Sequence, residues 1–162
     1  MISIDPSARI SPLADLEDSV RGTRIVVGPG VTIDAFVKIK PAGGIGDVTI
    51  GAGSTINSGC VLYSGNGIDI GKNVAIAANC TLAPVNHAYK RADVPIVSQG
   101  FGPSKGGVTV GDDVWIGANC VLLDGTRIGV GCVIGAGSIV RGELEPFGVY
   151  GGSPLRLLGH RS

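Results

Sequence analysis

An aliphatic residue stands at every sixth position along most of this chain, in six groups of three. All eighteen members of this row are Ile, Leu or Val: Ile4, Ile10 and Leu16; Val27, Ile33 and Ile39; Ile50, Ile56 and Leu62; Ile70, Ile76 and Leu82; Val110, Ile116 and Leu122; Ile128, Ile134 and Val140. An amphipathic helix would place its apolar residues three and four apart. The strict period of six, with Gly and Asn between the aliphatic residues, therefore predicts short strands joined by tight bends.

The period of six is interrupted only after complete groups of three. About five, five, two and twenty-two residues are inserted after Leu16, Ile39, Leu62 and Leu82, respectively. Extra residues can leave a packed coil only at a corner, so the breaks predict three-sided coils with every loop at one corner. We expect residues 1–162 to form a single all-β domain, a parallel β-helix of about six coils whose layers pair as parallel strands.

Small or β-branched residues usually follow four positions after each member of the aliphatic row, and we expect them to face inward. All four cysteines of the chain fall on these positions: Cys60, Cys80, Cys120 and Cys132. We expect the first three to stack in one interior column, where a free cysteine acts as a small hydrophobic residue. The cysteines form no Cys-x-x-Cys pair, so the sequence predicts no metal site.

The composition excludes several classes of protein. With 44% hydrophobic residues, and thirteen basic residues balancing thirteen acidic ones, the chain is not disordered. The zero formal charge argues against a nucleic-acid partner, which would require an excess of Lys and Arg. No apolar stretch approaches the roughly 18 residues of a membrane span, and the N-terminus lacks the features of a signal peptide. We therefore expect a cytoplasmic protein with no membrane span.

The longest interruption, residues 83–109, is expected to leave the body as an extruded loop, and long loops in compact domains are usually functional. It contains Asn86, His87 and Tyr89, followed by a basic cluster of Lys90, Arg91 and Lys105. A histidine at the boundary between a rigid scaffold and a loop is a candidate general base. His160 lies in the short C-terminal tail, residues 146–162, which we expect to be flexible.

Three motifs accompany the repeat: Val-Gly-Asp-Asp-Val-Trp-Ile-Gly-Ala-Asn at 110–119, Ile-Gly-Ala-Gly-Ser at 134–138, and Gly-Gly-Ser-Pro at 151–154. Together with Asn86-His87, they resemble the hexapeptide-repeat acyltransferases, a family with a left-handed parallel β-helix. Within this family the chain is most similar to the maltose and galactoside type of sugar O-acetyltransferase and to polysaccharide O-acetyltransferases. The resemblance covers nearly the whole chain.

The resemblance implies an enzyme that transfers an acetyl group from acetyl-CoA to a hydroxyl of a sugar or polysaccharide precursor. His87 matches the general base of the family, which takes the proton of the acceptor hydroxyl as the hydroxyl attacks the thioester directly. The implied acceptor-binding residues are Asn57, Asn86, Tyr89 and Trp115. The implied residues for coenzyme A are Trp115, Gly117, Ala118, Ala136, Arg141 and Arg156. The family is typically trimeric, so we expect the His87 loop of one subunit to complete a groove on another.

Two other functions remain open at this stage. The same scaffold and base could acetylate the amine of a nucleotide-linked amino sugar, or the chain could be an assembly protein without activity. A carbonic anhydrase on this scaffold would need three histidines around a metal, whereas the chain has two. Release of thiol from acetyl-CoA with a panel of acceptors would separate the open readings.

Overall fold

The structure is a computed structural model that describes all 162 residues. Each six-residue repeat forms a strand of two or three residues, and from the second coil on most repeats then turn a corner through a left-handed backbone conformation. Asn73, Asn79 and Asn119 have φ values of 55°, 60° and 59° at such corners, and Gly53 and Gly137 occupy equivalent corners with φ of 71° and 72°. Gly adopts this conformation at no steric cost, and Asn and Asp more readily than most residues, so the corners account for much of the high glycine content, although Phe36 and Phe147 also adopt it.

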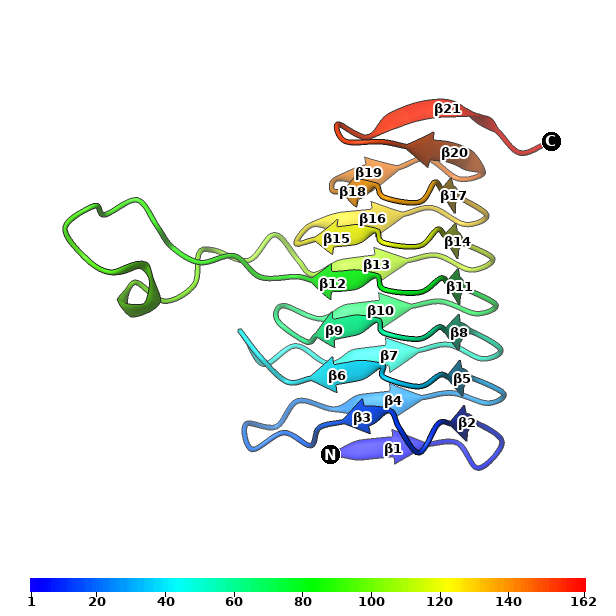
Figure 1. Ribbon diagram of the computed structural model, residues 1–162, viewed down its shortest axis with the longest axis horizontal. Coiled ribbons are helices and arrows are strands. Elements are labelled where there is room, and N and C mark those ends of the chain that lie inside the picture. Colours follow the sequence, from blue (N-terminus) through cyan, green and yellow to red (C-terminus); the bar gives the residue numbers. More distant parts are fainter.

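Successive strands join three sheets in turn, so the chain winds into a three-sided prism (Figure 1). The first sheet contains β1 (Ile2–Ile4), β4 (Ile25–Val27), β7 (Val48–Ile50), β10 (Ile68–Ile70), β13 (Val108–Val110), β16 (Thr126–Ile128) and β19 (Glu143–Leu144). The second contains β2 (Arg9–Ile10), β5 (Thr32–Ile33), β8 (Thr55–Ile56), β11 (Ala75–Ile76), β14 (Trp115–Ile116), β17 (Val133–Ile134), β20 (Gly148–Gly151) and β21 (Arg156–His160). The third contains β3 (Asp15–Leu16), β6 (Lys38–Lys40), β9 (Val61–Tyr63), β12 (Thr81–Ala83), β15 (Val121–Leu123) and β18 (Ile139–Val140).

All strand pairs are parallel except β20 with β21, and the only helix is the single-turn 3₁₀ helix η1 (Ile96–Ser98). The structure therefore confirms an all-β chain of parallel sheets, consistent with a left-handed β-helix. The sheets hold seven, eight and six strands, so the number of coils depends on how the closing strands are assigned.

The predicted aliphatic row lines the interior of the prism. Fifteen of its eighteen members are buried, and the exceptions are Ile4, Ile10 and Leu16. Ile4 is 43% exposed because no layer covers β1 to β3 from below. Burial of each of these side chains contributes about 1.5–3 kcal/mol to the free energy of folding. The row is therefore the main source of stability.

The cysteine column is also confirmed. Each thiol donates to a backbone carbonyl of the next layer, with Sγ to O distances of 3.1 Å from Cys60 to Ala77, 3.1 Å from Cys80 to Gly117 and 3.3 Å from Cys120 to Gly135. All four cysteines are free and buried. The pKa of the Cys80 thiol rises to about 11, since the lowering effect of its hydrogen bond with Cys120 is outweighed by the hydrogen bond with Cys60 and by burial.

All four insertions lie between a strand of the third sheet and the following strand of the first sheet, as the period predicted. The longest insertion projects away from the prism (Figure 1). We call residues 84–107 the arm. The predicted boundaries of 83–109 were slightly too wide, because Ala83 ends β12 and β13 already starts at Val108.

The C-terminal segment 146–162 is not a flexible tail. It forms β20, which extends the second sheet beside β17, and β21, which folds back antiparallel to β20. His160 pairs with Gly148 in this hairpin, and the Arg161 guanidinium binds Asp113 Oδ2 and the Gly131 carbonyl, both at 2.9 Å. The expectation failed because β21 has no six-residue period and is held by pairing with β20.

The structure contains no helix of sufficient length and apolar character to cross a membrane.

Candidate functional site

The arm holds His87 close to the prism, because its two limbs pair with each other just outside the corner. Gly102 N donates to Asn86 O at 2.7 Å, and Ala88 N donates to Gly100 O at 3.0 Å. His87 and Phe101 face each other in an antiparallel bridge, with ring centroids 4.9 Å apart. The imidazole follows the end of β12 by only four residues, so the scaffold and the paired limbs together restrict its position.

A groove of about 1370 Å³ lies between the arm and the adjoining corner of the prism. The arm contributes Asn86, His87, Tyr89, Lys90, Arg91 and Lys105 to its lining, among others. The prism contributes Asp124, Arg127, Arg141 and Glu143 from the two layers that follow the arm. A ligand in this groove would contact both a loop and the rigid scaffold, as is common at substrate sites.

The groove is rich in cations. Arg91 is paired with Asp93 at 2.6 Å, and its hydrogen bond lowers the pKa of that carboxyl group. The other cations of the groove take part in none of the six ion pairs of the chain: Lys90, Lys105, Arg127 and Arg141. Unpaired Lys and Arg side chains around an open groove favour an anionic ligand, such as one that carries phosphate groups.

His87 likewise takes part in none of the ion pairs. Its imidazole is paired with one aromatic ring, that of Phe101, and the two rings are tilted relative to each other. The side chain is exposed and faces the groove. An imidazole can act as a general base and accept a proton from a bound hydroxyl or amine. The arrangement therefore provides a base beside a cationic groove.

The structure brings together four of the predicted site residues. Asn86, His87, Tyr89 and Arg141 all line the groove. The Tyr89 side chain is 69% exposed, which leaves it free to contact a ligand.

Five other predicted residues lie elsewhere on the same chain. Trp115 is on β14 in the second sheet and is 56% exposed. The others lie at the corner that follows this sheet, whereas the arm follows the third sheet: Asn57, Gly117, Ala118 and Ala136. One chain alone therefore does not bring these residues to His87.

Two of these residues also have a role within the prism. The side-chain amide of Asn57 donates to Ile76 O at 2.7 Å, so it joins two layers of the β-helix. A Cβ atom at Gly117 would lie 2.5 Å from Ala136 N, so the close approach of the next layer requires glycine at this position.

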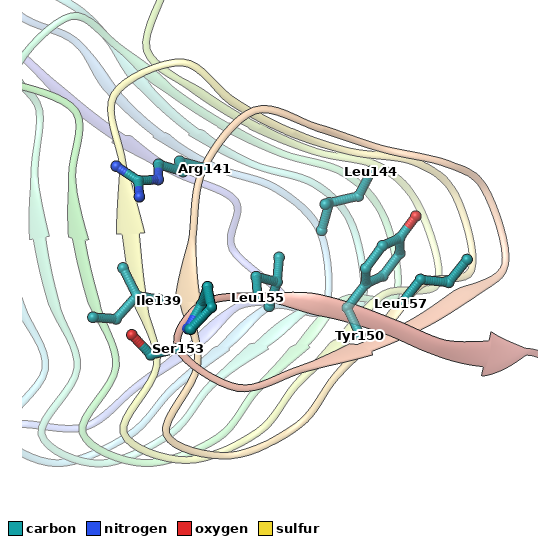
Figure 2. Close-up of a pocket in the computed structure, with 8 residues that line it drawn as sticks. Ile139, Arg141, Leu144, Tyr150, Ser153, Leu155 and Leu157 are labelled. Carbon is teal, nitrogen blue, oxygen red and sulfur yellow. The ribbon is translucent and has the colours of Figure 1, made fainter.

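A second pocket, of about 540 Å³, lies at the C-terminal end of the prism (Figure 2). Leu144, Tyr150 and Leu157 lie on one side of this pocket, and Arg141 lies on the opposite side. Arg141 lines both pockets and so stands between them. Arg156, predicted to bind coenzyme A, is exposed on β21 and lines neither pocket.

The sequence did not identify Asp124 as part of the site. This residue lies between β15 and β16, lines the groove, and is only 4% exposed. Its position before Gly125 is typical of an ordinary turn. No local signal distinguishes it, because its hydrogen-bond partners are distant in the sequence.

The comparisons with known proteins agree with the fold. Residues 107–142 match the family described as bacterial transferase hexapeptide, six repeats. The putative lipopolysaccharide biosynthesis O-acetyl transferase WbbJ of Escherichia coli is 30% identical over 143 residues, 85% of this chain and 69% of WbbJ. The galactoside O-acetyltransferase of Escherichia coli is 33% identical over 116 residues, 69% of this chain and 53% of that enzyme.

A solved structure of a variant of AntD, an N-acyltransferase from Bacillus cereus, in complex with dTDP-4-amino-4,6-dideoxyglucose and coenzyme A, superposes with a TM-score of 0.83. It is 27% identical, and the match covers 99% of this chain and 84% of that one. The mitochondrial gamma carbonic anhydrase 2 of Arabidopsis thaliana is 36% identical over 138 residues, 80% of this chain and 49% of that protein. The chain spans about half to two thirds of the length of these curated relatives. No group of three or more His, Cys, Asp or Glu side chains in this structure could hold a metal ion.

Proposed function

Because the chain belongs to the hexapeptide-repeat acyltransferase family, we propose that it transfers an acetyl group from acetyl-CoA to a hydroxyl of a sugar or polysaccharide precursor. The observation that carries this proposal is the placement of His87, an unpaired imidazole at the edge of a cationic groove. The relatives WbbJ and galactoside O-acetyltransferase support the choice of an oxygen acceptor. We take residues 1–162 as one catalytic domain of about six coils, closed by β19 to β21.

In the proposed reaction His87 acts as general base. It accepts the proton of the acceptor hydroxyl while the hydroxyl oxygen attacks the carbonyl carbon of the thioester. The C–S bond then breaks, and the imidazolium returns the proton to the sulfur, which leaves as the free thiol of coenzyme A. Such a base contributes roughly 10² to 10⁴ to the rate. No covalent enzyme intermediate is required, because the thioester is already activated.

The cations of the groove support binding of an acyl-CoA. Arg127 and Arg141 of the prism line the groove together with Lys90 and Lys105 of the arm, and these cations suit the phosphate groups of the coenzyme. Tyr89 and Asn86 lie beside His87 and are assigned to the acceptor. The use of an acyl-CoA donor fits the cytoplasmic location that the sequence predicts.

We further propose that the active enzyme is a homotrimer. Trp115, Ala118 and Ala136, which the family resemblance assigns to coenzyme A, lie away from the corner that carries the arm. If a neighbouring subunit supplies them, the groove of one subunit is completed by the second sheet and corner of another. Arg156, exposed on β21, would reach the coenzyme in the same way.

A second candidate function is acylation of the amine of a nucleotide-linked amino sugar. The specific observation in its favour is the similarity to AntD, whose structure holds such a sugar together with coenzyme A. The unpaired cations of the groove would suit the diphosphate of the acceptor as well as they suit the coenzyme.

The test is the release of thiol from acetyl-CoA by the purified protein with a panel of acceptors. We expect release that depends on a neutral sugar or an oligosaccharide precursor. Release only with nucleotide-linked amino sugars would favour the second candidate. Absence of release with any acceptor, in protein of correct fold, would leave an assembly protein without activity and contradict the proposal.

A further inference from the structure

Asp124 has a buried carboxylate that the proposed reaction does not use. Its Oδ2 atom accepts hydrogen bonds from Lys105 N at 2.7 Å and from Asn66 Nδ2 at 3.1 Å. Its Oδ1 atom accepts a hydrogen bond from Gly107 N at 2.9 Å. No cation pairs with it, so three N–H donors alone compensate the removal of this group from water.

The donors around Asp124 come from the returning limb of the arm and from the layer below. Lys105 and Gly107 belong to the returning limb, just before β13. Asn66 links this limb to the outgoing one, because its backbone N–H donates to Pro84 O at 3.1 Å while its side chain binds Asp124. We call Asn66 and Asp124 the clasp.

The returning limb is seated tightly against the prism at this point. Gly125 N donates to Gly107 O at 2.8 Å, while Gly107 N donates to Asp124 Oδ1. Both backbone polar groups of Gly107 are therefore bonded to the turn at 124–125. A Cβ atom at Gly107 would lie 2.5 Å from Gly67 O, which leaves no room for a side chain. The base of the arm is therefore fixed by the hydrogen bonds of the clasp and by the close packing of Gly107 against Gly67.

His87 lies only three residues beyond Pro84, and the paired limbs connect it to the returning side through Phe101. A change in the base of the arm would therefore move the imidazole relative to the rim of the groove that Arg141 provides. We propose that Asp124, supported by Asn66, is a positioning residue that sets the placement of His87 over the groove. This inference rests on the proposed function for its effect on rate, but its structural part can be tested without any activity.

The first variant is Asp124→Asn, which keeps the size of the side chain but turns one acceptor into an amide donor. All three partners are N–H donors, so at least one would face another donor. We expect kcat to fall by about tenfold to a hundredfold, since a displacement of about 1 Å is enough for such a loss. The KM for acetyl-CoA should rise by a smaller factor than kcat falls, because Arg127 and Arg141 of the prism stay in place even though Lys105 moves with the arm.

Two readouts report on the arm itself. Trypsin cuts after Lys90, Arg91 and Lys105, and we expect cleavage there to accelerate about tenfold or more when the clasp opens. The chain has only two histidines, so the imidazole signals of His87 can be assigned in a ¹H–¹⁵N NMR spectrum by comparison with the His87→Ala protein. In Asp124→Asn we expect the His87 signals to shift, while those of His160 stay in place.

The matched control is Asp112→Asn. Asp112 Oδ1 also accepts a backbone hydrogen bond at a corner, from Lys72 N at 2.7 Å, but it lies away from the arm. The Asp112→Asn protein should retain the wild-type kcat and the wild-type pattern of trypsin cleavage. Asn66→Ala removes the side-chain contact with Asp124 and keeps the two backbone bonds to Lys105 and Gly107, so it should give an intermediate effect.

The proposal is overturned if Asp124→Asn keeps its trypsin resistance and its His87 signals, or if kcat stays within about twofold of the wild type while the arm opens. It is also overturned if Asp112→Asn causes the same changes. If the wild type releases no thiol with any acceptor, the proposed function fails, whereas the trypsin and NMR results still decide whether the clasp positions His87.

Discussion

The prism and the arm are built on opposite principles. In the prism, fifteen interior aliphatic residues are buried, and neighbouring layers pair strand by strand. In the arm, Ile96 and Val97 are 54% and 84% exposed, and the only regular structure is η1 with no buried residue. The prism accounts for the stability of the molecule, while the arm carries His87 and most of the residues that line the groove. The repeat thus provides a rigid scaffold, and the arm can carry functional residues without contributing to the core.

The largest effect that tests this division is expected from His87→Ala. Loss of the base should reduce kcat by roughly 10² to 10⁴, with the midpoint of thermal unfolding unchanged, because the side chain is exposed on the arm. Thiol release from acetyl-CoA and circular dichroism provide the two measurements. A variant that keeps wild-type turnover would remove His87 from the mechanism.

The converse substitution lies inside the prism. Ile116 is fully buried on β14, and Ile116→Ala should lower the free energy of unfolding by about 2–5 kcal/mol through lost burial and a residual cavity. Urea unfolding followed by circular dichroism would measure this change. A loss below about 1 kcal/mol would show that the interior row is not the main source of stability.

A smaller effect is expected from the interior thiols at high pH. Burial raises the pKa of Cys132 above its usual value of 9.0. Above about pH 9 the thiol of the unfolded chain ionises while the folded one stays protonated, so the free energy of unfolding should fall as pH rises. We would measure urea unfolding at several values between about pH 8 and pH 10. The free energy of unfolding should fall less steeply with pH for Cys132→Ala than for the wild type. Identical slopes in the two proteins would contradict this reading.

The smallest effect is expected at the tip of the arm. Val97→Ala should change the free energy of unfolding by no more than about 0.5 kcal/mol, because the Val97 side chain is 84% exposed. The same urea experiment serves here, with Ile116→Ala as the comparison. A loss comparable to that of Ile116→Ala would mean that the arm is covered in solution, for example by a neighbouring subunit.

Most of the prism could be predicted from the sequence, because its period of six is a local signal that every layer repeats. The same signal located the corner that carries the insertions. It did not reveal that Ile4 stays exposed at an open end, since the period says nothing of what lies below the first layer. It also missed β21, whose partner β20 comes before it in a hairpin rather than one layer away.

The site was less predictable, for a different physical reason. His87 and Tyr89 could be placed because the arm is continuous in sequence. Asp124 meets Asn66 across 58 residues, and such a contact depends on how three layers stack. The separation of Trp115 from the arm follows from the register, since β14 belongs to the second sheet and the arm leaves the third. The family resemblance assigned His87, Tyr89 and Trp115 to one function without showing that Trp115 lies on a different side of the prism from the arm.

The most direct test of the account is a crystal structure of the protein with coenzyme A bound. The account predicts that the sulfur of the coenzyme lies in the groove beside the His87 imidazole, with the phosphate groups among Arg127, Arg141 and the lysines of the arm. It also predicts that Trp115 of a neighbouring subunit borders the same coenzyme. A coenzyme bound elsewhere on the prism, or an imidazole turned away from the sulfur, would contradict it.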